Sequence, residues 1–198
     1  RIEALSWFKA SADEGHSMAM FNYVMMFIKE KEKGNDIIEN GKPITVDDVM
    51  NKYMKQAADV GNVSAMNSFG SYLLKQKKVK QAAHYFSLST QKKNSIGMTK
   101  LANLLKQKLD NSNEQANNDD DFVINDIQQA KQMVVDLFQQ ASDLGNKSAM
   151  NHLASLYLEG TFIPKDLEKA KSIYQKSASL GSQKAEKMLS TISLSTEE

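Results

Sequence analysis

One short pattern, Gly-Asn-x-Ser-Ala-Met-Asn, occurs twice in this chain, at positions 61–67 and 145–151. The same kind of segment precedes both copies: a pair of large apolar residues, then two small residues, an Asp and the Gly. A sequence that repeats itself over tens of residues is typical of an array of small units, because each unit buries its apolar face only against its neighbours. The repeat therefore predicts a tandem array rather than two copies of a catalytic loop.

Five copies of the pattern can be aligned on the apolar pair that opens each of them. These pairs begin at positions 7, 53, 85, 137 and 173, so the spacings are 46, 32, 52 and 36 residues. The underlying period is near 36, and two intervals carry insertions. Each copy holds two apolar segments with the 3.6-residue spacing of a helix, for example Val134, Leu137, Phe138 and Ala141. The array is therefore predicted to consist of helix-turn-helix units.

The turns between the helices have a recognisable chemistry. In four copies a Gly follows the first of the two helices. The residue that ends a helix is often left-handed, and glycine adopts that conformation at little cost. In three of these four copies the next residue is one that caps helices well. The four glycines are Gly15, Gly61, Gly145 and Gly181, and the expected caps are Asn62, Asn146 and Ser182. The third copy is weaker, because Lys93 stands where the Gly should be.

The fourth and fifth copies carry the resemblance to a known family. The segment from Ser148 to Gly181 resembles a Sel1-like repeat, which is a relative of the tetratricopeptide repeat. The matching positions are Ala149, Leu153-Ala154, Tyr157, Gly160, Lys165-Asp166, Lys169-Ala170, Ile173-Tyr174, Ser177-Ala178 and Gly181. The resemblance implies an all-α fold: a right-handed α-solenoid of about five helix-turn-helix units and about ten helices, forming one array over residues 1–198.

Three parts of the chain depart from the regular repeat. Residues 33–44 are expected to form an inserted linker, which ends before a capping box made by Thr45 and Asp48. Residues 109–122 are polar, Asn-rich and acidic, and are expected to form a second, disordered linker. Residues 182–194 are expected to form a polar helix that caps the array. The sequence starts within a helical pattern, without an initiator Met, so we expect it to be a fragment of a longer chain.

No constellation in the sequence predicts catalysis, a cofactor or a metal site. The chain contains no cysteine, which excludes disulfides and thiolate chemistry. Its three histidines, His16, His84 and His152, lie in different copies without metal-ligand spacing. The run Asp119–Asp121 lacks the alternating ligands and the Gly of a calcium loop. We therefore predict that the chain is not an enzyme.

Charge is unevenly distributed, although the formal net charge is only +1. No Asp or Glu occurs between positions 61 and 109, and lysines gather there. The lysines of this basic band that we expect at a binding surface are Lys75, Lys77, Lys78, Lys80, Lys92 and Lys93. The band is either a solvated surface or a docking site for an acidic partner. Nucleic acid is the alternative ligand of the stretch 75–108, but it is disfavoured because the chain has a single arginine, the residue best suited to bidentate recognition.

By the resemblance to tetratricopeptide proteins, one helix of each pair lines a concave face that binds partners. On that basis the predicted partner-binding residues are Phe21, Met25, Asn67, Ser71, Thr99, Asn103, Asn151 and Ser155. The leading prediction is a non-catalytic adaptor that binds other proteins or extended peptides, with no membrane span in this sequence. The sequence leaves localisation unknown: it slightly favours the cytoplasm and leaves the endoplasmic reticulum and the mitochondrion open.

Overall fold

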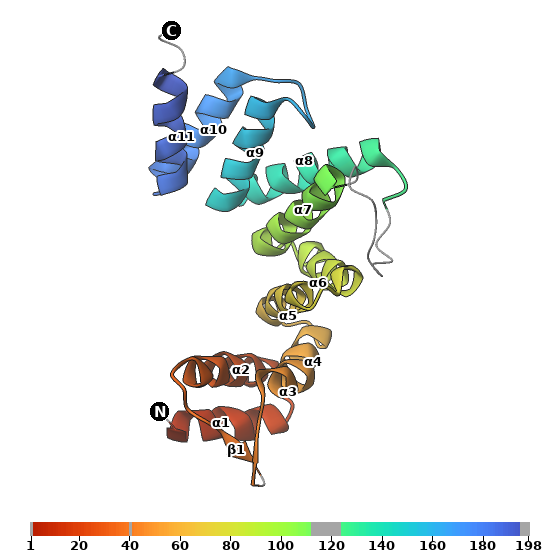
Figure 1. Ribbon diagram of the computed structural model, residues 1–198, viewed down its shortest axis with the longest axis vertical. Coiled ribbons are helices and arrows are strands. Elements are labelled where there is room, and N and C mark those ends of the chain that lie inside the picture. The colour runs from red at the N-terminus through yellow and green to blue at the C-terminus, as the bar shows by residue number, and fades with distance from the viewer. Residues whose placement is uncertain (1, 40, 112–123, 195–198) are drawn as a thin grey trace. The chain divides into compact units, whose positions relative to one another are not determined.

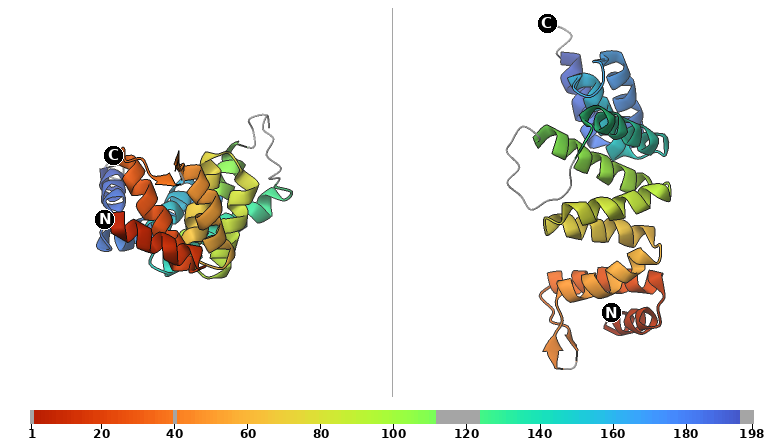
Figure 2. Two further views of the ribbon diagram at one scale, coloured as in Figure 1. Left: turned by 90° about the horizontal axis from the view of Figure 1, so that it is seen from below. Right: turned by 90° about the vertical axis from the view of Figure 1, so that its right-hand side faces the viewer.

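The computed structural model describes residues 2–39, 41–111 and 124–194 of the chain (Figure 1). These residues are almost entirely helical, and successive helices run back and forth (Figure 2). The elements, in order, are α1 (Ile2–Asp13), α2 (Ser17–Glu32), β1 (Ile38–Glu39), β2 (Lys42–Pro43), α3 (Val46–Val49), η1 (Met50–Met54), α4 (Lys55–Asp59), α5 (Val63–Lys75), α6 (Val79–Gln91), α7 (Ser95–Asp110), α8 (Ile127–Asp143), α9 (Lys147–Glu159), α10 (Leu167–Ser179) and α11 (Gln183–Leu194). With α3, η1 and α4 taken as one continuous helix, the described residues form ten helices, which confirms the predicted all-α class and the helix count.

The chain divides into two compact units, residues 1–92 and residues 93–198. Each unit has its own core, which is built from the apolar stripe of one helix packed on the next. In unit 1, Phe86 of α6 lies against Gly70 of α5, so closely that a Cβ on Gly70 would come within 2.6 Å of the Phe86 ring. In unit 2, Phe138 of α8 and Leu153 of α9 are fully buried in one cluster, and Tyr174 packs in a second cluster with Ala154.

The predicted turn chemistry is confirmed. Each of the four turn glycines has a positive φ, between 80° and 102°, which is the left-handed region that glycine adopts without strain. The Asn62 side chain accepts a hydrogen bond from the backbone N–H of Ala65, and Asn146 does the same for Ala149. The capping box of Thr45 and Asp48 is also present.

The cap asparagines have a second role that the sequence did not reveal. The side-chain amide of Asn62 donates to the carbonyl oxygen of Ser17 at 3.4 Å, and that of Asn146 donates to the Ser95 hydroxyl at 3.3 Å. Ser17 and Ser95 are the first residues of α2 and α7. Each asparagine therefore caps its own helix and ties it to the equivalent helix of the preceding repeat.

The third copy keeps the turn geometry without its glycine. Lys93 has φ = 55°, so a lysine adopts the left-handed conformation that glycine supplies elsewhere. Asn94 then caps α7 by accepting hydrogen bonds from the N–H groups of Ile96 and Gly97. Lys77, in the turn between α5 and α6, has φ = 60°. A left-handed residue with a side chain costs roughly 1–2 kcal/mol, so the turns at both lysines are strained.

The described residues include the first predicted linker, the start of the second and the helix α11. The segment predicted as the first linker contains a short antiparallel hairpin, in which Ile38 pairs with Pro43 and Glu39 with Lys42. In the segment predicted as the second linker, α7 continues to Asp110, and residues 112–122 lie outside the described residues. The helix α11 spans the segment predicted to cap the array, and its role as a cap stays a prediction.

Candidate protein-binding face

The eight predicted partner-binding residues lie on four equivalent helices, the second helix of each of the first four aligned copies. Unit 1 contributes pairs from α2 and α5, and unit 2 contributes pairs from α7 and α9. Their exposure differs widely. Met25 is 44% exposed, while Phe21, Ser71, Asn103 and Ser155 are half-buried. Asn67, Thr99 and Asn151 are buried, with 7%, 6% and 5% of their surface exposed, which the sequence pattern did not predict.

The hydrogen bonds of Asn151 show why this buried residue is not available to bind a peptide. Its side-chain amide donates to the Ser182 hydroxyl at 2.8 Å, and its carbonyl oxygen accepts from the Ser177 hydroxyl at 2.8 Å. Both the donor and the acceptor that would recognise a peptide backbone are therefore used inside unit 2, between α9, α10 and the start of α11. Peptide binding through Asn151 would require the protein to give up these two bonds.

An exposed apolar stripe runs along α2. Met18, Phe21 and Met25 follow one another at helical spacings of three and four residues, so they share one face of the helix. Met18 is 61% exposed and Met25 is 44% exposed, and Lys29 continues the same face in the last turn. Phe21 and Met25 were predicted from the sequence and Met18 was not, although a spacing of three residues before Phe21 points to it.

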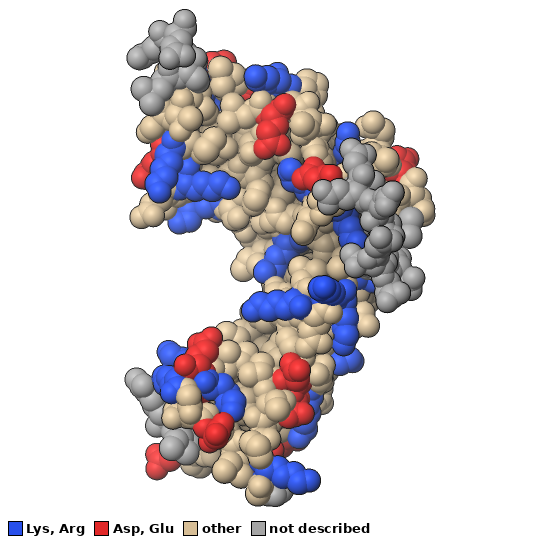
Figure 3. All heavy atoms as spheres, in the orientation of Figure 1, with Lys and Arg blue, Asp and Glu red and all other residues tan. Residues whose placement is uncertain are grey.

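The basic band is divided by the structure into two clusters. The first comprises Lys75, Lys77, Lys78 and Lys80, around the turn between α5 and α6. The second comprises Lys92 and Lys93, at the other end of α6, and 13 helical residues separate the two by about 20 Å. Figure 3 shows the blue side chains gathered over the region of α5 and α6, where red ones are missing from the visible face. Within the described part of the chain, none of these six lysines forms an ion pair with a carboxylate.

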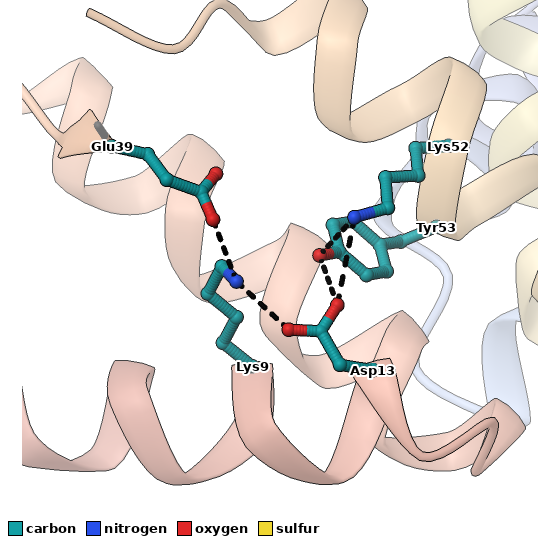
Figure 4. Close-up of polar contacts among 5 residues, drawn as sticks. All are labelled: Lys9, Asp13, Glu39, Lys52 and Tyr53. Atoms are coloured by element: carbon teal, nitrogen blue, oxygen red, sulfur yellow. Dashed lines mark hydrogen bonds and ion pairs between the residues drawn. The ribbon is translucent and has the colours of Figure 1, made fainter. Parts of the chain in front are cut away.

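A polar network connects α1, the hairpin and η1 (Figure 4). Lys9 lies 2.8 Å from Asp13 and 2.7 Å from Glu39, and the Tyr53 hydroxyl donates to Asp13 at 2.6 Å. Lys52 completes the network by donating to the Tyr53 hydroxyl at 2.8 Å. The hydrogen bonds from Lys9 and Tyr53 lower the pKa of Asp13. Burial, followed by the hydrogen bond to Asp13, raises the pKa of Tyr53, so this hydroxyl is held protonated and is unsuited to act as a base.

The same arrangement recurs one repeat later, which identifies it as a structural device. Lys55 lies 2.6 Å from Asp59, and the Tyr85 hydroxyl donates to Asp59 at 2.8 Å. Burial acts to raise the pKa of Asp59, but the hydrogen bonds from Lys55 and Tyr85 outweigh it and lower that pKa. A network that recurs with the repeat period joins neighbouring repeats rather than forming a single active site.

The histidines are not gathered into a metal site. His16 and His84 are exposed, whereas His152 is half-buried and stacks on Phe138 with 5.1 Å between the ring centres. Burial, with a contribution from nearby Lys184, lowers the pKa of His152 and so favours its neutral form. Over residues 2–39, 41–111 and 124–194, no three His, Asp or Glu side chains are placed to hold a metal ion together.

The repeat chemistry described above agrees with the comparison to known proteins. The Sel1 repeat family model matches residues 1–16 and 147–182. In these two segments the chain matches the Sel1 repeat. Both matched segments contain the turn that ends in Gly15 or Gly181, so the motif that defines the repeat in the sequence also defines the family match. Among curated proteins, no significant match to the chain is found.

Two solved structures share the fold of this chain. One is a Sel1 repeat protein from Oxalobacter formigenes, with a TM-score of 0.71 and 22% identity over 96% of this chain and 69% of the other. The second is c5321, a protective antigen of uropathogenic Escherichia coli strains with an SLR fold, with a TM-score of 0.68 and 18% identity over 90% of this chain and 33% of the other. At these identities the similarity establishes the helical solenoid repeat fold.

No helix among the described residues is both long enough and apolar enough to cross a membrane.

Proposed function

We propose that the chain is a non-catalytic adaptor that binds partner proteins on the exposed faces of the equivalent helices α2, α5, α7 and α9. Proteins with Sel1 repeats generally act as protein-interaction scaffolds, which supports this class of function. The observation that carries the proposal for this chain is the stripe of Met18, Phe21 and Met25 on α2. Methionine side chains are flexible and polarizable, and they suit a surface that adapts to a partner.

Charge complementarity defines the partner further. The stripe on α2 ends at Lys29, and the equivalent end of α5 carries the exposed pair Leu74 and Lys75. Lys29 and Lys75 therefore place positive charge beside the apolar surface. The partner that fits is a peptide segment with large apolar residues and at least one acidic residue close to them.

A substitution on the stripe tests this function. The protein and its Met18→Glu/Met25→Glu variant would be used to capture partners, and bound proteins would be compared by mass spectrometry. Leu180→Glu is the matched control, because Leu180 is 47% exposed on another helix end. We expect a defined partner to bind the protein and the control but not the stripe variant. A partner set that is identical for all three proteins would refute the stripe as the binding face.

The unpaired lysine clusters support a second candidate, the binding of nucleic acid. Neutralisation of phosphates by lysines would make the affinity fall steeply with salt. The cluster around the α5–α6 turn is dense, but the distance of about 20 Å to Lys92 and Lys93 interrupts the band. RNA affinity that decreases with salt and is lost on charge reversal at Lys77, Lys78 and Lys80 would favour this candidate. Salt-independent protein binding that needs Met18 and Met25 would favour the adaptor.

A further inference from the structure

The 11 methionines of the chain differ sharply in their access to water. Three are exposed: Met18 by 61%, Met133 by 45% and Met25 by 44%. Two more are half-buried, and the rest are at most 4% exposed; the buried ones are Met20, Met50, Met54, Met66, Met98 and Met150. An oxidant dissolved in water reaches an exposed thioether and is kept from a buried one, so only a few of these sulfurs are open to oxidation.

Two of the three exposed methionines lie on the same face of α2. Met18 and Met25 are seven residues apart, which is two helical turns or about 10 Å, and Phe21 lies between them. Met20 follows Met18 by two residues, yet it is 1% exposed on the packed side of the helix. The apolar stripe of α2 therefore presents two accessible thioethers, while the core side of the same helix shields another.

The exposure of these two sulfurs is a property of their positions in the repeat. The position of Met18 is also exposed in the next three copies, where the residues are Ser64, Ile96 and Ser148. The position of Met25 is half-buried in those copies, where the residues are Ser71, Asn103 and Ser155. Each of these copies has another copy before and after it in the sequence, so neighbouring repeats leave both positions accessible. Methionine occupies them in α2 alone.

Oxidation by a peroxide would change the chemistry of the stripe. The thioether sulfur attacks one peroxide oxygen, and an S–O bond forms as the O–O bond breaks. The sulfur loses two electrons, and the other oxygen leaves and takes up a proton as water or an alcohol. The sulfoxide is polar and accepts hydrogen bonds, so a flexible apolar side chain becomes a polar one. Methionine sulfoxide reductases reverse the change.

We propose that Met18 and Met25 form a reversible oxidation site, at which a peroxide switches off partner binding by α2. The inference rests on the adaptor function proposed above, because the stripe of Met18, Phe21 and Met25 is the face that the switch controls. Two sulfoxides would flank Phe21 and interrupt the apolar surface that a partner needs. The buried methionines escape the oxidant, so the fold is retained while the binding face changes.

Peptide mapping by mass spectrometry, after timed exposure to hydrogen peroxide, tests the chemistry of the site. We expect sulfoxide to form about tenfold faster at Met18 and Met25 than at Met20, with an unchanged circular dichroism spectrum. The two methionine sulfoxide reductases, one for each sulfoxide epimer, should restore both thioethers. Equal rates at Met18 and Met20, unfolding on oxidation, or sulfoxides that the reductases leave in place would each overturn the proposal.

A binding assay tests the switch. The probes are peptides selected from a random phage-displayed library that bind the untreated protein but not its Met18→Glu/Met25→Glu variant. We expect oxidation to weaken their binding about tenfold and the reductases to restore it. Met18→Leu/Met25→Leu keeps an apolar stripe of similar volume and should bind the peptides before and after peroxide. Met133→Leu, on α8, is the matched control and should stay sensitive to peroxide.

The outcomes separate this proposal from the adaptor function. Binding that survives oxidation of Met18 and Met25, or that peroxide also abolishes in Met18→Leu/Met25→Leu, would overturn the switch and leave the adaptor function standing. A library that yields no peptide dependent on the stripe would refute the adaptor face, and the switch with it.

Discussion

The two units join successive repeats by different means. In unit 1 the connection between repeats is charged: Tyr53 donates to Asp13, and Tyr85 donates to Asp59. In unit 2 the equivalent positions hold Leu137 and Ile173, which pack in apolar clusters. Unit 2 also contains buried hydrogen bonds that join Asn151 to Ser177 and Ser182. One repeat fold therefore accommodates two chemistries at the same interface, and only the one in unit 1 depends on ionised side chains.

The largest loss of stability should follow the removal of a buried polar contact in unit 2. Asn151→Ala deletes two buried hydrogen bonds and leaves the hydroxyls of Ser177 and Ser182 without this partner. We expect the free energy of unfolding to fall by about 2–3 kcal/mol, because buried groups that lose their partners keep the cost of desolvation. Urea denaturation would measure the loss. A change below about 0.5 kcal/mol, which is usual for surface substitutions, would contradict the assigned role.

Gly70 and Ala154 occupy the same position in their repeats. The second test exchanges glycine and alanine at these two sites. Gly70→Ala would press a methyl group against the buried ring of Phe86, and we expect a loss of about 1–2 kcal/mol despite the better helix propensity of alanine. Ala154 is buried in a cluster with Tyr174, so Ala154→Gly should lose about 1–2 kcal/mol through poorer packing and propensity. Thermal unfolding of the two variants gives both values, and stabilisation by Gly70→Ala would show that Phe86 can move aside.

Acid should weaken unit 1 through Asp13 and Asp59, whose carboxylates accept hydrogen bonds from Lys9 and Tyr53 and from Lys55 and Tyr85. The pKa values of Asp13 and Asp59 are lowered in the folded protein, so the unfolded state binds more protons. The stabilisation is present above the unfolded pKa of about 3.9 and is lost as the pH falls through the lowered folded values. Tyr53→Phe and Tyr85→Phe should each cost about 1 kcal/mol at neutral pH and should reduce this acid sensitivity.

Hydrogen exchange measured at pH 7 and at pH 3 would show whether acid weakens unit 1 more than unit 2. Amides of residues 46–91 should lose protection at the lower pH more than those of residues 127–192. Loss of protection that is equal in both units, or unchanged by Tyr53→Phe and Tyr85→Phe, would contradict the role of the tyrosines.

The smallest effect concerns the turn at the start of unit 2. Lys93→Gly replaces a strained left-handed lysine with the residue found in the other copies, and it should stabilise the protein by about 0.5–1 kcal/mol. Gly145→Lys is the reverse change at an equivalent turn and should destabilise by a similar amount. A shift of the melting temperature in the same direction for both variants would contradict this account.

The sequence alone determined the repeat, the helix class and the chemistry of the turns. These depend on local physics: a left-handed residue favours glycine, a helix start favours Asn, Ser or Thr, and an apolar stripe with helical spacing favours a packed helix. That is why Gly61, Asn62 and the Thr45 capping box could be located without a structure. The left-handed conformation of Lys93 also follows from its place in the repeat, once the turn is known.

Only the tertiary structure decided which polar residues face solvent. Asn151 and Ser155 lie four residues apart on one helix, yet one is buried and the other is half-exposed, because Ser177 and Ser182 from later elements reach Asn151 alone. The lysines form one band in the sequence and two clusters in space, since the length of α6 separates them. The exposure of Met18 likewise depends on which helices pack against α2, and that is a property of packing partners far apart in the sequence.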